Sequence, residues 1–272
     1  MNEKSKPKVV PLLLNKYFDQ PTVFTPESLL RETRRQKSIP EGRVPDICIL
    51  DPDGDIVRNL LVEKKMQPNR YWACYHTELF DYVQDDLEFG IIGCAVGAPF
   101  AVLIAEELFA SGCRLLISIT SAGQILPVRN PPYFILIDKA LRDEGTSYHY
   151  LPPSRYSTLN EELLDMMKES FNKSGIHISQ GATWTTDAPF RELQKAIDYC
   201  RAEGILAVEM EAAALYAFAH ARGKHVICIA HVTNQMGSKN GDFEKGDADG
   251  SREALKLISL IAGVWKEHNS ET

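Results

Sequence analysis

Long apolar runs and an excess of basic residues are both missing from this sequence. No apolar run approaches the roughly 18 residues that a membrane-spanning helix needs, so we expect no membrane segment. The chain has 30 Lys and Arg against 37 Asp and Glu, a formal net charge of −7. That balance argues against a protein that binds nucleic acid by neutralising phosphates. The short apolar patch near the first residue has no small-residue cleavage site, so we expect no signal peptide there.

Cysteine pairs are missing as well. The six cysteines stand singly, without a CxxC pair and without a histidine at metal-binding spacing. Most lie inside apolar runs such as Asp46–Leu50, which is typical of buried residues in a reducing compartment. We therefore expect a soluble, cytoplasmic protein without a metal site and without a nucleophilic thiol. A content of 44% apolar and 25% charged residues excludes a disordered chain.

The composition and hydrophobic pattern of the sequence change near Pro45. Residues 1–45 are rich in proline and charge, and we interpret them as an N-terminal arm with one short helix at Glu27–Gln36. Beyond Pro45, short apolar runs alternate with helical patterns, which is typical of an α/β protein. We expect residues 46–272 to form a single domain with a central, mixed, largely parallel twisted sheet flanked by helices.

Three turns that contain glycine follow predicted strands: Gly54–Arg58, Gly93–Gly97 and Thr120–Gly123. Turns at the carboxyl ends of parallel strands meet at one edge of a sheet, where ligands bind. Gly54 presents backbone N–H groups before a helix, and Arg58 adds a forked cation one turn later. That pairing suits an anion such as phosphate, although an ordinary loop with a solvated arginine has the same sequence.

The segment Glu209–Ala214 begins a helix directly after an apolar run. Its two carboxylates flank Met210, and acidic residues are favoured at a helix N-terminus for electrostatic reasons alone. A carboxylate there can also hold both hydroxyls of a sugar, with the methionine packed under the ring. Two further polar clusters, Thr185–Asp187 and Thr233–Asn234, end other predicted strands, either as simple turns or as parts of one shared site.

Together these segments resemble the nucleoside phosphorylase superfamily of purine nucleoside phosphorylase, uridine phosphorylase and methylthioadenosine nucleosidase. Gly204–Tyr216 is similar to the ribose-binding segment of bacterial hexameric purine phosphorylases. Asp46–Arg58 is similar to their first strand and Gly-Asp-x-x-Arg phosphate loop. Ile91–Ile125 and Arg142–Pro152 extend the resemblance, which runs from Asp46 to Asn234.

The resemblance implies roles residue by residue. Inorganic phosphate would be the co-substrate, with no other cofactor and no metal, and its ligands would be Gly54, Arg58, Arg70 and Ser121. Met210 and Glu211 would hold the ribose. The base would be lined by Ala122, Gly123, Trp184, Thr185, Phe190, Val208 and Asn234. Glu211, Arg58 and Asn234 would be the catalytic residues. Arg70 would be lent across a subunit interface, which implies a homo-oligomer built from dimers, either a trimer or a hexamer.

The expected reaction is phosphorolysis of a ribonucleoside, most consistent with a purine. Asn234 can donate only N–H hydrogen bonds to the leaving base, which suits a 6-oxopurine or uracil better than adenine. The pyrimidine-reading segment of the family is replaced by Ala188–Glu192, so uracil recognition of the usual kind is not supported.

Two departures keep alternatives open. Ser118 stands where hexameric and uridine phosphorylases carry an arginine, which allows a nucleosidase that uses water instead of phosphate. The phosphate loop also carries an insertion and has Ile56 in place of a proline. Together with Asn234 and the altered base loop, these changes also allow a nucleoside-binding protein without turnover.

Overall fold

The computed structural model of the chain describes residues 10–174, 178–235 and 244–270. The helices of these residues are α1 (Pro26–Lys37), α2 (Asp55–Val62), α3 (Ala98–Ala110), α4 (Glu161–Ser174), α5 (Gln194–Ala202), α6 (Ala212–Arg222) and α7 (Ser251–Ser270). The strands are β1 (Ile47–Asp51), β2 (Met66–Pro68), β3 (Phe80–Gln84), β4 (Leu87–Gly93), β5 (Leu115–Gln124), β6 (Tyr133–Asp143), β7 (Tyr156–Thr158), β8 (Ser179–Thr186), β9 (Ala207–Glu209) and β10 (His225–Gln235). Short 3₁₀ helices are η1 (Pro11–Leu13), η2 (Thr146–His149), η3 (Pro189–Arg191) and η4 (Asp247–Gly250).

One mixed sheet organises the molecule. Strand β1 lies between β4 and β5 and is parallel to both. Strand β5 is also parallel to β10, and β10 is antiparallel to β6. Strand β6 is parallel to β8, β8 is parallel to β9, and β9 returns antiparallel to β5. These pairings close β5, β10, β6, β8 and β9 into a ring, while β4, β3 and β2 extend the sheet beyond β1.

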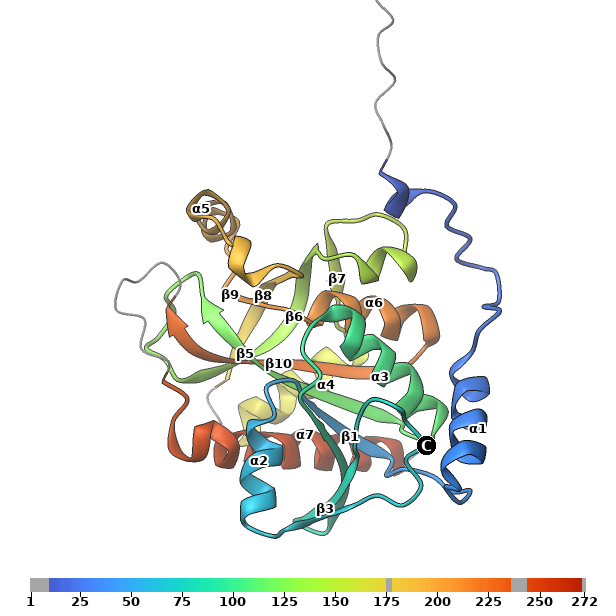
Figure 1. Ribbon diagram of the computed structural model, residues 1–272. Helices are drawn as coiled ribbons and strands as arrows, with labels where there is room; N and C mark the ends of the chain where they lie inside the picture. Colours follow the sequence, from blue (N-terminus) through green and yellow to red (C-terminus); the bar gives the residue numbers. More distant parts are fainter. Residues whose placement is uncertain (1–9, 175–177, 236–243, 271–272) are drawn as a thin grey trace, which may run out of the picture.

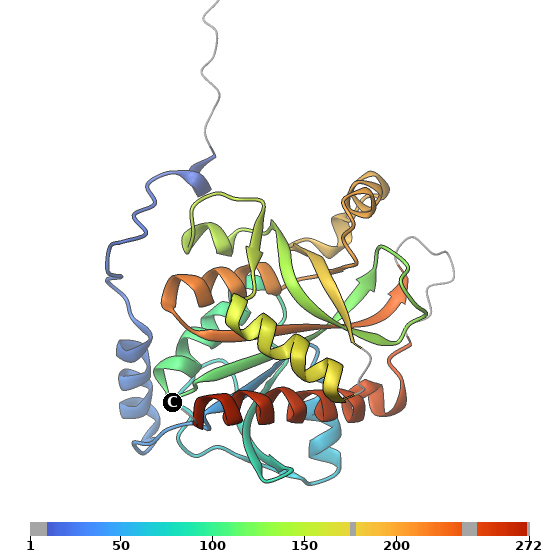
Figure 2. The ribbon, with the colours of Figure 1, turned by 180° about the vertical axis from the view of Figure 1, so that it is seen from behind.

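Helices cover both faces of this sheet (Figure 1). α3 packs against α6 on one face, and α7 packs against α2 and α4 on the other (Figure 2). Strand β1 has the sequence ICILD and is buried at every position, as expected for a strand covered on both faces. The fold is therefore the single-domain α/β architecture that the alternating pattern predicts.

The N-terminal segment lies on the outside of this domain. α1 begins at Pro26 and is capped by the Thr25 hydroxyl, which accepts a hydrogen bond from the Ser28 N–H at 3.3 Å. It confirms the short helix that the sequence predicts at residues 27–36, and it packs against α3. The segment before it runs past the outer side of the domain toward η2 (Figures 1 and 2). The boundary at residue 45 stays a prediction. No helix of the described ranges is long and apolar enough to cross a membrane.

Candidate functional site

The turn after β1 is shaped by the buried carboxylate of Asp51. It accepts hydrogen bonds from the N–H groups of Gly54 at 3.1 Å and Val57 at 3.0 Å, which ties the turn to the first turn of α2. Burial is the main cause that raises the pKa of Asp51 to about 7. Gly54 has φ 77°, and a Cβ there would lie 2.6 Å from the Cys94 sulfur. Both the backbone conformation and the close approach of β4 therefore require glycine.

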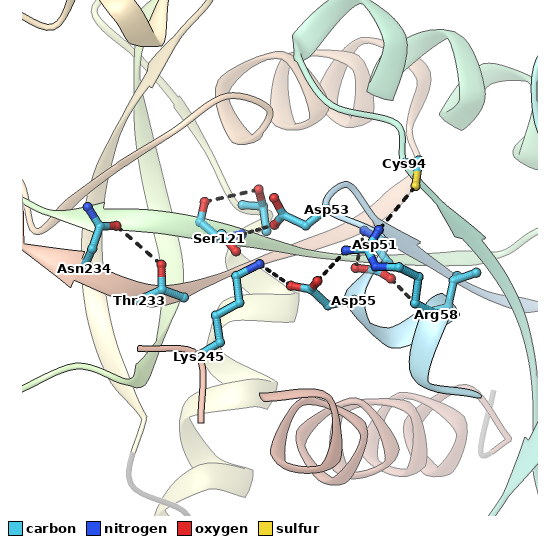
Figure 3. Close-up of polar contacts among 12 residues, drawn as sticks. Asp51, Asp53, Asp55, Arg58, Cys94, Ser121, Thr233, Asn234 and Lys245 are labelled. Carbon is cyan, nitrogen blue, oxygen red and sulfur yellow. Dashed lines mark hydrogen bonds and ion pairs between the residues drawn. The ribbon is translucent and has the colours of Figure 1, made fainter. Parts of the chain in front are cut away.

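A cation and an anion are paired at the start of α2. The Arg58 guanidinium contacts the Asp55 carboxylate at 2.5 Å, and Lys245 contacts the other oxygen of Asp55 at 2.5 Å (Figure 3). The Arg58 side chain is 57% exposed, so it is accessible to a ligand. Lys245 comes from the segment just before η4, which brings the C-terminal part of the chain to this turn.

A third carboxylate reaches across to β5. The Asp53 side chain accepts a hydrogen bond from the backbone N–H of Ser121 at 2.8 Å (Figure 3). The structure thus places Ser121 close to the turn that holds Gly54 and Arg58. The prediction of a turn at residues 120–123 is wrong, because β5 continues to Gln124 and pairs there with β10 and β9. The phosphate-binding role stays a prediction. The structure also shows that the N–H of Ser121 already has an anionic partner from the chain itself.

Glu211 lies beside this site at the N-terminus of α6. It is 1% exposed, and its carboxylate accepts hydrogen bonds from the Gly97 N–H at 2.7 Å and the Thr120 hydroxyl at 2.9 Å. Burial, followed by the nearby charge of Glu209, raises the pKa of Glu211 to about 8. The N–H of Met210 also faces this carboxylate at 3.3 Å. The Met210 backbone and the Glu211 carboxylate therefore contact each other, and ribose binding by these two residues stays a prediction.

Glu209 is turned the other way and holds the backbone. One carboxylate oxygen accepts the N–H groups of Glu211 and Ala212, both at 2.7 Å. The other oxygen accepts the hydroxyls of Thr183 at 3.0 Å and Thr185 at 2.5 Å. Burial raises the pKa of Glu209 as well. This network fixes the start of α6, and with it the position of the Glu211 backbone.

Four residues predicted to contact the base form one row across the sheet. Asn234 of β10 pairs in register with Gly123 of β5. Gly123 pairs in turn with Val208 of β9, and Val208 pairs with Trp184 of β8. Trp184 and Val208 belong to a small apolar cluster with α5, and the Trp184 indole donates a hydrogen bond to Asp143 at 2.9 Å. The Thr233 hydroxyl contacts the amide oxygen of Asn234 at 3.4 Å. The row therefore has the polar Asn234 at one end and the apolar Val208 and Trp184 at the other.

Other predicted residues lie elsewhere. Phe190 is 100% exposed in η3, so within this chain it does not line the row. The Thr185 hydroxyl is committed to Glu209 and to the N–H of Ala213 at 3.0 Å, so this side chain supports the site without facing a base. Ala122 is buried in the main core. Arg70 stacks over the Tyr71 ring at 4.6 Å, and the described residues show no contact between it and the Gly54 turn.

Sequence reasoning missed five residues of this constellation. Asp53, Gly97, Thr120 and Glu209 each contact a residue expected in the site, and Lys245 contacts Asp55, the neighbour of Gly54. The resemblance gives none of the five a role, and the glycine turn after β4 is the sequence signal for Gly97. Nothing local marks Lys245, because its contact with Asp55 spans most of the chain. In the part of the chain that the structure describes, no group of three or more His, Cys, Asp or Glu could hold a metal ion.

Comparison with known proteins points to one family. The model of the phosphorylase superfamily matches residues 55–264. The chain is 26% identical over 187 residues to the uridine phosphorylase of Thermococcus kodakarensis, covering 62% of this chain and 66% of that protein. It is 26% identical over 148 residues to a DeoD-type purine nucleoside phosphorylase of Shewanella sp. strain MR-4, covering 54% of this chain and 63% of that protein. The matches thus span less than two thirds of either relative.

The fold is similar to that of a solved uridine phosphorylase. A crystal structure of uridine phosphorylase from Vibrio fischeri superposes with a TM-score of 0.67 at 20% identity, and the match covers 82% of this chain and 92% of that one. The expected resemblance and the α/β fold are both confirmed by these comparisons.

Proposed function

Because the chain belongs to the phosphorylase superfamily, we propose that it catalyses the reversible phosphorolysis of the N-glycosidic bond of a purine ribonucleoside. The products are the free base and ribose 1-phosphate. The cytoplasmic location and the homo-oligomer built from dimers, with Arg70 lent across the subunit contact, are part of this proposal.

One observation carries the proposal. Two consecutive residues of β5 contact the two predicted subsites: the Thr120 hydroxyl donates to Glu211, and the Ser121 N–H donates to Asp53 beside Gly54. A sugar held by Glu211 and an anion held at Ser121 and Arg58 would therefore be adjacent. Phosphorolysis needs that adjacency, because much of its acceleration comes from holding the nucleophile against the anomeric carbon.

The mechanism follows from these positions. Glu211 accepts hydrogen bonds from the ribose 2′- and 3′-hydroxyls, with Met210 packed beside the sugar. The glycosidic bond lengthens toward an oxocarbenium-like sugar, and the negative phosphate on the opposite face stabilises that charge and attacks C1′. The bond electrons leave with the base, and Asn234 stabilises them by donating an N–H hydrogen bond.

The proposed base preference rests on Asn234 and on the apolar residues Val208 and Trp184 in the same row. An amide cannot supply a proton, so it favours a base that carries its developing charge well, such as a 6-oxopurine. Trp184 and Val208 are the apolar members of the row that contains this amide, which suits a purine ring. Inosine and guanosine are therefore the proposed substrates, ahead of adenosine.

Hydrolysis of the same bond is the second candidate, and Ser118 favours it. The Ser118 side chain is buried, and its hydroxyl has no hydrogen-bond partner among the described residues. It cannot supply the positive charge that an arginine would give to bound phosphate. If phosphate binding is too weak for this reason, water would take its place as nucleophile.

A panel of nucleosides tests both candidates. Base release from inosine, guanosine, adenosine, uridine and methylthioadenosine is followed by ultraviolet absorbance, with and without phosphate. Inosine and guanosine cleaved only with phosphate is the expected result. Equal cleavage without phosphate would establish the hydrolase, and the Glu211→Ala variant purified in the same way controls for contaminating enzymes.

A further inference from the structure

The backbone N–H of Ser121 is occupied by a side chain of the same molecule. The Asp53 carboxylate accepts it at 2.8 Å, although the two residues are 68 positions apart in sequence. Asp53 follows β1 by two residues and lies directly before Gly54. It therefore connects the Gly54 turn, whose Gly54 and Val57 N–H groups are bound by Asp51, to Ser121 in the second half of β5 (Figure 3).

This contact can open without unfolding the turn. Asp51, not Asp53, holds the turn together through the N–H groups of Gly54 and Val57. Asp53 is only partly buried, and in the described part of the chain Ser121 is its hydrogen-bond partner. A rotation of the Asp53 side chain would release the N–H of Ser121 and leave the rest of the turn in place.

The surrounding charges make Asp53 a strong competitor for an incoming anion. Arg58 and Lys245 are both paired with Asp55. Asp53 adds a carboxylate to this turn, and Ser118 adds no charge. A phosphate that enters here therefore meets a like charge as well as an N–H group that already has an acceptor.

We propose that Asp53 is an internal anion that competes with inorganic phosphate for the Ser121 N–H and sets the affinity of the enzyme for its co-substrate. This inference rests on the proposed function, because it takes phosphate as the ligand of this turn. Phosphate binds only to molecules in which Asp53 has turned away, so its apparent dissociation constant is the intrinsic value divided by the fraction of open molecules.

Calorimetric titration of the full chain with inorganic phosphate tests this directly. Asp53→Ala removes the competitor, and we expect the dissociation constant to fall about tenfold, the size of one charged hydrogen bond lost to the competitor. Asp53→Asn keeps a side chain that can accept from Ser121 but removes its charge, so it should give an intermediate value. Asp86→Asn, an exposed residue of the β3–β4 turn, is the matched control for the loss of one negative charge.

The outcomes separate this inference from the proposed function. An unchanged or weaker affinity in Asp53→Ala, in a variant whose thermal unfolding shows that it is folded, overturns the competition. An equal gain in Asp86→Asn also overturns it, because the effect is then one of net charge. If Asp53→Ala tightens phosphate binding but no nucleoside is cleaved, the inference holds and the proposed function fails. If nucleoside cleavage depends on phosphate but the wild type and all variants bind phosphate with the same affinity, the proposed function holds and the inference about Asp53 fails.

Discussion

The backbone N–H of Glu211 donates a hydrogen bond to the carboxylate of Glu209, two residues before it, at 2.7 Å. The carboxylate of Glu211 itself points away, to Gly97 and Thr120. Two acids of the same short segment therefore have separate tasks. Glu209 fixes the start of α6, and Glu211 is the proposed ribose ligand.

Replacing Glu211 should remove activity more than stability. Above its native pKa of about 8, Glu211 is a carboxylate that can accept from both ribose hydroxyls, whereas Glu211→Gln keeps the volume but turns one acceptor oxygen into a donor. The two proteins are therefore compared at about pH 9. We expect kcat/KM for the best nucleoside to fall about 100-fold, the size found for groups that act in the transition state. Steady-state kinetics measure this, with the exposed Glu169→Gln on α4 as the control. Full activity in Glu211→Gln would exclude a ribose-binding role.

Replacing Glu209 should mainly lower stability. The two carboxylate oxygens of Glu209 accept four hydrogen bonds. In Glu209→Gln one oxygen becomes an NH₂ group, which then faces either the two threonine hydroxyls or the two backbone N–H groups. A buried group left without its partner costs about 1–3 kcal/mol. Urea denaturation should therefore show a drop of that size in the free energy of unfolding. No drop would mean that the network does not hold the start of α6.

The buried Glu211 should also make stability depend on pH. Its native pKa of about 8 lies above the ordinary glutamate value of 4.5, so between these values the native state keeps a proton that the unfolded state has lost. The free energy of unfolding therefore falls as pH rises from about 4.5 to 8, by up to about 1.4 kcal/mol per pH unit. Glu211→Gln has no titrating group at this position, so its free energy of unfolding does not fall for this reason. We expect its stability relative to the wild type to rise between pH 5 and pH 8 in urea titrations, and parallel curves would contradict the raised pKa.

Asn234 should decide the base. Asn234→Asp places a group that can carry a proton next to the leaving base, and adenine needs that proton more than hypoxanthine does. We expect the ratio of kcat/KM for adenosine over inosine to rise about tenfold. Competition between the two nucleosides in one reaction, analysed by chromatography, measures the ratio. Asn234→Ala serves as the control, because it should lower both rates without favouring adenosine.

Much of this arrangement could be predicted from local patterns. The alternation of apolar runs and helices predicts the α/β fold. The turns at residues 54–58 and 93–97 and the Glu-Met-Glu segment predict that Gly54, Gly97 and Glu211 lie near one edge of the sheet. These features depend on backbone conformation and on neighbours in the chain, which the sequence displays directly.

The remainder depends on long-range contacts. The sequence places Asp53 next to Gly54, but only the folded chain shows that its carboxylate reaches Ser121. Thr185 looked like a base contact, yet burial against α6 turns its hydroxyl to Glu209. Phe190 looked like a ring for stacking, and the short η3 leaves it in solvent. Side-chain direction at strand ends is set by packing across the sheet, which no local pattern records.

The identity of the sugar product tests the central claim most directly. Inosine and phosphate are incubated with the enzyme, and the products are followed by ³¹P NMR while hypoxanthine is quantified by absorbance. The proposed function predicts one ribose 1-phosphate for each hypoxanthine, at a rate that rises with phosphate concentration. Free ribose at the same rate with or without phosphate would contradict it and assign the site to hydrolysis.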